Sequence, residues 1–227
     1  MSARPFDEAT PGDALVSRLS RLRSALISDC LDSCGLRDRA MSSRLRPLYP
    51  GARLAGRAHT VRAISVDGPP PRREDWYRGE LCAIDALQPG DVLVVSTCPN
   101  GPFFGELLGT AARRRGAVGA VIDAATRDSD QLAEMGFPTF VTSVNPLDSL
   151  GRIDVDATGI EIECGGVTVA HGDLVIADAD GVVVIPASLA ERIIELAEDK
   201  ESGEDTVRRA IASGMGAWEA FKTYGVI

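Results

Sequence analysis

Two adjacent residues, Arg127 and Asp128, are the best candidates for chemistry in this sequence of 227 residues. They follow the short apolar run Val118–Ile122 by a few positions. The planar fork of an arginine side chain can bind a carboxylate or carbonyl oxygens, and an aspartate can hold a hard divalent cation. Alone, such a pair is more often a surface ion pair, so its meaning depends on its neighbours.

The expected neighbour is the stretch Gly105, Glu106, Leu107 and Leu108, which is predicted to open a helix that runs to Gly116. The first N–H groups of a helix lack partners within it and carry partial positive charge. A glycine there lets an anion approach the backbone, although the pattern by itself more often marks a plain helix start. Combined with the Arg-Asp pair, it predicts a site for a small α-keto acid that stabilises an enolate. A metal and the arginine would bind the keto oxygen, and backbone N–H groups the carboxylate.

A strand–helix–strand unit is predicted to position these groups. Val92–Val95 is predicted to form one buried strand, and Val118–Ile122 another that ends in Asp123. A short helix over Ser129–Met135 and a third strand over Pro138–Val141 continue the series. Ligands bind at the carboxyl ends of the strands in open α/β sheets, which is where the polar residues gather.

Further elements are predicted on both sides of this unit. Helices are expected near Asp13–Leu19 and Ser24–Cys34, with Ser24 as N-cap and Gly35 as the left-handed stop. Leu54–Ile64 alternates as a strand does, and its His59 is interpreted as a half-buried, hydrogen-bonded histidine rather than a ligand.

The second half of the chain changes character. Between positions 157 and 185, short apolar runs alternate with glycine-bearing turns, which predicts β-hairpins. Pro186–Ile227 is predicted to be helical, and Gly203 destabilises its charged part by about 1 kcal/mol relative to alanine. A polar helix with so little to bury is expected to pack on another subunit. The pattern as a whole predicts an α/β fold in which an α/β layer joins a β layer.

Residues 67–80, with three consecutive prolines, are predicted to be a turn-rich excursion before a short helix over Leu81–Leu87. Long loops in compact domains are often functional. A lid or specificity loop and an ordinary surface or subunit-contact loop both remain open for this segment.

The composition excludes several classes of function. The net charge of −9 argues against a nucleic-acid partner, and no apolar run approaches the ~18 residues of a membrane helix. The two lysines, Lys200 and Lys222, are not placed for Schiff-base chemistry. Two histidines and five scattered cysteines offer little for a zinc site and predict free thiols in the cytoplasm. Carboxylate and water ligands, and therefore Mg²⁺ or Mn²⁺, are expected for any metal.

Four segments resemble the RraA-like family, which includes 4-hydroxy-4-methyl-2-oxoglutarate and 4-carboxy-4-hydroxy-2-oxoadipate aldolases and regulators of RNase E activity. They read GRAHTV, GELLGTAARRRGAVGAVIDAATRD, PTFVTSVNPLDSLGR and GGVTVAHGDLVIADADGVVVIP. The resemblance spans residues 24 to 214. It implies a single-domain β/β/α sandwich over residues 24–186, between an N-terminal segment (1–23) and a C-terminal helical extension (187–227) that contacts other subunits.

The resemblance also implies roles for individual residues. The backbone of Gly105–Leu108 would bind a pyruvyl carboxylate, and Arg127 would contact the keto and carboxylate oxygens. Asp128 would bind Mg²⁺ or Mn²⁺ directly, and Glu106 would reach the metal through water. In a homotrimer or hexamer, a glutamate from a neighbouring subunit's C-terminal helix completes the site. The candidates for it here are Glu201 and Glu204.

We therefore expect a metal-dependent lyase that cleaves a 4-hydroxy-2-oxo acid by a retro-aldol reaction and releases pyruvate, with oxaloacetate decarboxylation as related enolate chemistry. The alternative is a non-catalytic regulator that binds an RNA-degrading enzyme. A methyltransferase is rejected because no glycine-rich nucleotide loop follows a strand. Ala124 stands where the family usually has glycine, and the Arg73–Glu80 segment replaces a usual Asp-Asn pair. These departures concern the choice of substrate.

Overall fold

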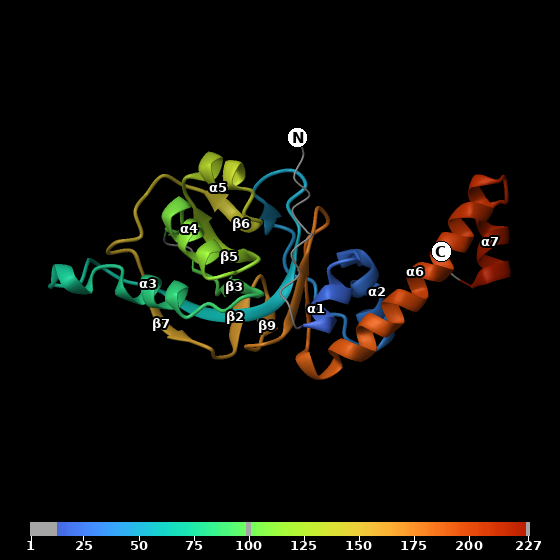
Figure 1. Cartoon of the computed structure of the whole chain (residues 1–227), viewed down its shortest axis with the longest axis horizontal. Helices are drawn as coiled ribbons and strands as arrows, with labels where there is room; N and C mark the ends of the chain where they lie inside the picture. The colour runs from blue at the N-terminus through green and yellow to red at the C-terminus, as the bar shows by residue number, and fades with distance from the viewer. Residues whose placement is uncertain (1–12, 99–100, 226–227) are drawn as a thin grey trace.

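A nine-stranded mixed sheet forms the centre of the protein. The computed structural model describes residues 13–98 and 101–225. The strand order is β1-β6-β5-β3-β2-β10-β11, and β4 and β7 pair with β5 and β2 outside this path. The long, curved β2 crosses the middle of the molecule (Figure 1). Residues 1–12, half of the segment expected to precede the domain, lie outside the described residues.

The strands are β1 (Arg46–Pro47), β2 (Leu54–Ser65), β3 (Asp91–Val95), β4 (Pro102–Phe104), β5 (Gly119–Thr126), β6 (Thr139–Val144), β7 (Ile153–Thr158), β8 (Ile162–Cys164), β9 (Val167–Val169), β10 (Leu174–Ala177) and β11 (Val182–Ile185). The helices are α1 (Ala14–Leu19), α2 (Ser24–Ser33), α3 (Arg78–Asp85), α4 (Glu106–Arg114), α5 (Ser129–Met135), α6 (Ala190–Ala212) and α7 (Ala217–Tyr224). Short 3₁₀ turns, η1 (Arg73–Asp75) and η2 (Ala187–Leu189), precede α3 and α6.

The parallel part of the sheet follows from its apolar runs. Strands β2, β3, β5 and β6 are parallel neighbours, and the crossovers from β3 to β5 and from β5 to β6 contain α4 and α5. Every residue of β5 is buried. Parallel strands covered on both faces need such continuous apolar sequences, so the predicted strand–helix–strand series is confirmed.

Three layers surround the sheet. Helices α3, α4 and α5 cover one face, where Ile84, Ala112 and Leu132 join a core with Leu93 and Ile122 of the sheet. The β8–β9 hairpin belongs to the core of the opposite face. Helices α1, α2 and α6 pack against β10 and β11 in a third core. The expected mixed α/β sandwich with C-terminal helices is therefore confirmed.

Several predictions about the strands were wrong because contacts between distant parts of the chain decide where those strands lie. The strand expected to end at Asp123 continues to Thr126, because the buried carboxylate accepts hydrogen bonds from the Thr97 hydroxyl and the Gly165 N–H group and faces Arg44 at 3.1 Å. β7, which pairs with β2, was not predicted. Contacts with residues far away in the sequence, such as those that stabilise the buried Asp123 carboxylate, cannot be predicted from a local sequence pattern.

The helix ends also differ in part. Ser24 is not the N-cap of α2. Arg23 holds that position, and the Ser24 hydroxyl donates to Asp178 Oδ1 at 2.6 Å. Gly35 has the expected left-handed conformation, with φ +82°. The helix predicted over Leu81–Leu87 spans Arg78–Asp85 instead, so the loop before it is shorter than expected.

The C-terminal helices leave the body of the molecule. α6 runs outward past α2, and α7 lies at its far end (Figure 1). α6 passes through Gly203 without interruption, despite the expected local cost of a glycine there. Its first half buries four residues and its second half buries Val207, while Trp218 of α7 is 68% exposed. Within residues 13–98 and 101–225, no helix is long and apolar enough to span a bilayer.

Candidate functional site

A pocket of about 280 Å³, here called the α4 pocket, lies where β4 and β5 end and α4 begins. The N–H group of Arg127 donates to the Phe104 carbonyl oxygen at 2.9 Å, which joins the two strand ends. The lining residues are Tyr77, Glu80, Leu81, Pro102, Phe103, Phe104, Gly105, Leu107, Leu108, Arg127, Asp128, Asp148 and Ser149. The structure thus brings the predicted helix start and the Arg-Asp pair into one pocket at the carboxyl ends of strands, as open α/β sheets do.

Gly105 forms the N-cap of α4 and lies tightly against the Arg-Asp pair. A Cβ atom added to it would lie 2.7 Å from Asp128 Oδ2 and 3.1 Å from Arg127 Cγ. Its φ of −155° is ordinary extended backbone, so space rather than conformation requires a glycine here. The Glu106 N–H group donates to Asp128 Oδ2 at 3.2 Å, and this carboxylate therefore caps the helix from outside.

Glu106 itself does not line the pocket. Its carboxylate accepts a hydrogen bond of 2.7 Å from the Thr110 hydroxyl, one turn further along the same helix. Leu107 lines the pocket and is 76% exposed. The predicted residues thus lie together, but the Glu106 side chain sits beside the pocket rather than in its wall.

Arg127 is held by a network that the sequence did not predict. Its Nη1 atom donates to Asp148 Oδ1 at 3.3 Å and to the Leu147 carbonyl oxygen at 3.4 Å. The Tyr77 hydroxyl donates to Asp148 Oδ2 at 2.6 Å. Burial raises the pKa of Asp148, but the hydrogen bond from Tyr77, backbone N–H groups and the Arg127 charge outweigh it and lower that pKa. An ionised Asp148 therefore orients the guanidinium group.

The backbone around the pocket is strained at two positions. Among the described residues, Tyr77 (φ 56°) and Asp128 (φ 55°) are the two non-glycine residues with positive φ. Both line the α4 pocket. Such a conformation costs on the order of 1–3 kcal/mol and persists when the surroundings impose it, which happens most often at functional sites. Aspartate tolerates this region better than a bulky tyrosine does.

Glu80 is a pocket residue that the sequence reasoning missed. It is 3% exposed, and the Ser149 hydroxyl donates to its Oε2 atom at 3.0 Å. Burial raises the pKa of Glu80 to about 7. A signal existed in its spacing from Ala83, Ile84 and Leu87, which all lie on the buried side. With the helix correctly started at Arg78, the i, i+3, i+4, i+7 pattern places a carboxylate on the apolar stripe.

The donor set of the pocket suits a hard cation that keeps water ligands. Asp128 Oδ1 has no hydrogen-bond partner within the described part of the chain, and Glu106 starts the adjacent helix. No cluster of three or more His, Cys, Asp or Glu side chains that could hold a metal occurs among the described residues. Mg²⁺ is typically bound through one or two carboxylates, water and substrate oxygens, so Asp128 fits that mode rather than a closed zinc site.

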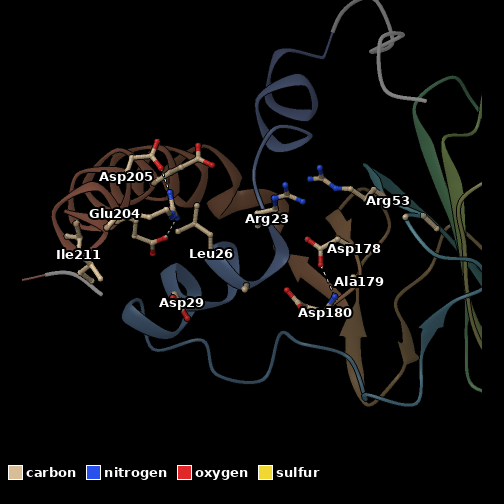
Figure 2. A pocket seen from close by; sticks show the side chains of 17 residues that line it. Arg23, Leu26, Asp29, Arg53, Asp178, Ala179, Asp180, Glu204, Asp205 and Ile211 are labelled. Carbon is tan, nitrogen blue, oxygen red and sulfur yellow. Dashed lines mark hydrogen bonds and ion pairs between the residues drawn. The ribbon is translucent and has the colours of Figure 1, made fainter. Parts of the chain in front are cut away.

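Glu201 and Glu204 lie elsewhere, in a larger hollow of about 1160 Å³ between α2 and α6, here called the α2–α6 groove. Figure 2 shows Glu204 and Asp205 on α6 and, across the groove, Arg23 and Arg53 near Asp178. Glu204 is 3.8 Å from Lys200 Nζ and 3.9 Å from Arg208 Nη2. Neither glutamate lines the α4 pocket of its own chain, so action on a neighbouring subunit stays a prediction.

His59 lies in the middle of β2, opposite Leu93 of β3, and its environment was only partly predicted. It is buried, at 7% exposed, with Nδ1 3.6 Å from Asp91 Oδ2 and its ring edge-on to His171. A hydrogen-bonded histidine was predicted, but the Nε2 atom has no hydrogen-bond partner among the described residues. His59 does not line the α4 pocket.

Comparison with known proteins shows that the chain belongs to the RraA-like family. The RraA-like family model, described as Aldolase/RraA, matches residues 24–184. A provisionally named 4-hydroxy-4-methyl-2-oxoglutarate aldolase of Halalkalibacterium halodurans is 29% identical over 209 residues, which cover 91% of this chain and 92% of that protein. Protein DlpA of Legionella pneumophila is 28% identical over 214 residues, which cover 92% of this chain but only 34% of DlpA.

A solved structure shares the fold. The crystal structure of RraAS2 from Streptomyces coelicolor, described as an unusual member of the RNase ES inhibitor RraA protein family, superposes with a TM-score of 0.76 at 33% identity. The match covers 87% of this chain and 98% of that one. The names of the relatives thus include both an aldolase and a ribonuclease inhibitor family.

Proposed function

Because this chain belongs to the RraA-like family, we propose that it is a divalent-metal-dependent lyase that cleaves a 4-hydroxy-2-oxo acid by a retro-aldol reaction and releases pyruvate. One observation carries the proposal: the start of α4, Arg127 and Asp128 line a single small pocket. Oxaloacetate decarboxylation passes through the same pyruvate enolate and is proposed as a second activity.

The helix start would bind the substrate's carboxylate. The first four N–H groups of an α-helix have no partner within it and attract anions. In this chain the Glu106 N–H group already donates to Asp128. The substrate's carboxylate would therefore bind to the following N–H groups, those of Leu107 and Leu108.

Arg127 would bind the keto oxygen and favour the enolate. Its guanidinium group is held by Asp148 and the Leu147 carbonyl oxygen, so it needs little reorganisation when charge develops on the oxygen. Mg²⁺ or Mn²⁺ would be held directly by Asp128 and through water by Glu106. When bound, it would supply positive charge opposite the developing enolate oxygen.

A homotrimer or hexamer is part of the proposal, with Glu201 or Glu204 of a neighbouring subunit completing the pocket. The outward course of α6 supports it, since the second half of this helix buries only Val207 against its own chain. The five cysteines are free, which fits a reducing compartment such as the cytoplasm.

The second candidate is a regulator that binds an RNA-degrading enzyme. The similarity to the Streptomyces coelicolor protein supports it. A surface for a protein partner, however, does not require two strained residues and a buried carboxylate in one pocket. A binding assay with a purified RNase E-type enzyme tests this candidate separately.

The test of the lyase is pyruvate release, measured with a coupled dehydrogenase, from oxaloacetate and from branched 4-hydroxy-2-oxo acids with Mg²⁺ or Mn²⁺. We expect EDTA to abolish the activity and Asp128→Asn to lower kcat/KM by about 10²–10³-fold, the range for removing one charge-stabilising group. The matched control is Asp130→Asn, two positions away, which is exposed and should retain the wild-type rate. Absence of pyruvate with every substrate, together with unchanged metal binding by Asp128→Asn, would refute the proposal.

A further inference from the structure

The wall of the α4 pocket contains one more carboxyl group, which the proposed binding of metal and substrate does not use. Glu80 lines the pocket together with Arg127 and Asp128, yet its side chain is almost completely buried. The Ser149 hydroxyl is its hydrogen-bond partner, and no lysine or arginine forms an ion pair with it among the described residues. A buried carboxylate without a cation is unfavourable, so its position needs a reason.

The fold holds this carboxyl group in place by tight packing. Gly79 lies directly before it, and a Cβ atom there would come within 2.6 Å of Asp154 Oδ1 and 2.9 Å of Val155 Cβ. The absence of a side chain at position 79 lets α3 approach β7 closely. Tyr77, the N-cap of α3, adopts its strained backbone immediately before this turn. Both features press the first turn of α3, which carries Glu80, into the pocket wall.

The groups around Glu80 come from each neighbouring segment. Asp154 belongs to β7, Asp148 and Ser149 to the loop after β6, and Arg127 to the loop after β5. Burial is the largest cause of the raised pKa. The Ser149 hydrogen bond lowers the pKa, the two aspartates raise it, and Arg127 lowers it. With a pKa of about 7, both protonation states are populated at neutral pH.

We propose that Glu80 is the acid–base residue of this pocket, which removes the proton from the substrate's 4-hydroxyl group and later delivers it to carbon 3 of the enolate. In the first step the O–H proton passes to the Glu80 carboxylate and carbon 4 becomes a carbonyl. The bond between carbons 3 and 4 breaks, and its electron pair forms the enolate. In the second step the enolate takes the proton on carbon 3, which gives pyruvate and restores the carboxylate. This role rests on the proposed lyase function.

The two proposed activities use opposite forms of Glu80, which makes the role measurable. Retro-aldol cleavage starts with the ionised form, so its kcat/KM should rise with pH and level off above about 7. Oxaloacetate loses CO₂ without a base and needs only a proton donor for the enolate. Its kcat/KM should therefore fall as the pH rises through the same value. Two profiles that mirror one another about one pKa are not expected from a residue that only supports the fold.

The experiment compares both pH profiles in the wild-type protein, Glu80→Gln and Glu134→Gln. Glutamine keeps the size and can still accept the Ser149 hydrogen bond, but it cannot carry a proton. We expect Glu80→Gln to lower retro-aldol kcat/KM by about 10²-fold or more, the usual contribution of a general acid–base residue. The rise of retro-aldol kcat/KM with pH and the fall of the decarboxylation value, here called the two pH limbs, should both disappear. Glu134 lies on α5 and is exposed, so its variant should behave as the wild type.

Ser149→Ala provides a second, independent measurement. Loss of the hydrogen bond that lowers the Glu80 pKa should shift both limbs to higher pH. Wild-type rates and limbs in Glu80→Gln, or unshifted limbs in an active Ser149→Ala variant, overturn the role of Glu80 while the lyase function stands. If the wild-type protein releases no pyruvate from any substrate, the lyase function fails and the role of Glu80 fails with it.

Discussion

Two hollows of this molecule, the α2–α6 groove and the α4 pocket, differ in a way that size does not predict. The α2–α6 groove, at about 1160 Å³, is roughly four times larger than the α4 pocket, at about 280 Å³. The small pocket nevertheless contains Tyr77 and Asp128, the two strained non-glycine residues among those that the structure describes, and the buried acid Glu80. The comparison indicates that unfavourable features held in place by the fold mark a chemical site better than volume does.

The charges of the groove are of another kind. Glu204, which lines the groove, pairs along α6 with Lys200 at 3.8 Å and with Arg208 at 3.9 Å, and Lys200 also pairs with Asp29 of α2. Arg208 also pairs with Asp205. Exposed pairs of this type contribute on the order of 0.3–0.5 kcal/mol each. Apart from the Lys200–Asp29 pair between α6 and α2, these pairs lie within α6, and the second half of α6 is the part that we propose reaches a neighbouring subunit.

The largest expected effect is a pH dependence of stability that comes from the α4 pocket and not from the groove. The pKa of Glu80 is raised by burial from 4.5 in the unfolded chain to about 7 in the folded one, so the folded state binds the proton more tightly. Its neutral form stabilises the fold fully below pH 4.5, and this contribution is lost as the pH rises to about 7. The loss should amount to about 3 kcal/mol.

Urea unfolding between pH 4 and 8 measures this loss. Glu80→Gln should remove most of the dependence in that window, whereas Glu134→Gln should leave it as in the wild type. Equal pH dependence in all three proteins would show that Glu80 ionises in the folded protein as easily as in water. The α4 pocket would then lose its clearest distinction from the groove.

The next effect concerns the contact between the start of α4 and the Arg-Asp pair. Gly105→Ala places a methyl group within 2.7 Å of Asp128 Oδ2, and overpacking of this kind typically costs about 1–3 kcal/mol. If the displaced group is Asp128, metal binding and pyruvate release should fall by about tenfold or more while the fold survives.

A matched glycine exists at the other end of the protein. Gly216 is the N-cap of α7 and has no atom within 4 Å of an added Cβ. Gly216→Ala should therefore leave metal affinity, measured by calorimetry, and activity at wild-type values. Equal metal affinity in the two variants would contradict the tight placement of Asp128 against α4.

The smallest effect on stability tests the groove. Glu204→Gln should change the free energy of unfolding by less than about 1 kcal/mol, since its ion pairs are partly open to solvent, with the Glu204 side chain 26% exposed. If Glu204 completes a neighbour's pocket, the same variant should lose pyruvate release despite its unchanged stability.

Mixing two inactive variants makes this test specific. Hybrid oligomers of Asp128→Asn and Glu204→Gln subunits contain some pockets with both native residues, so mixing after dissociation and reassembly should restore part of the activity. Full activity of Glu204→Gln by itself would remove Glu204 from the site. The same pair of measurements on Glu201→Gln would then decide between the two glutamates.

Much of the parallel core could be predicted because its determinants are local. The run Val92–Val95 lies within β3, and Ser129–Met135 matches α5 at both ends. Gly136, with φ +67°, ends that helix as a left-handed C-cap. Apolar runs and capping glycines determine the structure of residues close to them in the sequence, so a local sequence pattern is enough to predict these elements.

The sequence by itself determined the α/β character, the order of the central elements and the grouping of Gly105–Leu108 with Arg127 and Asp128 at one end of the sheet. Only the tertiary structure decided the rest of the pocket. Tyr77 and Asp148 hydrogen-bond across 71 positions of sequence, and Glu80 and Ser149 across 69. A buried charge and a strained backbone are stable only through the packing of distant segments, which no local pattern records.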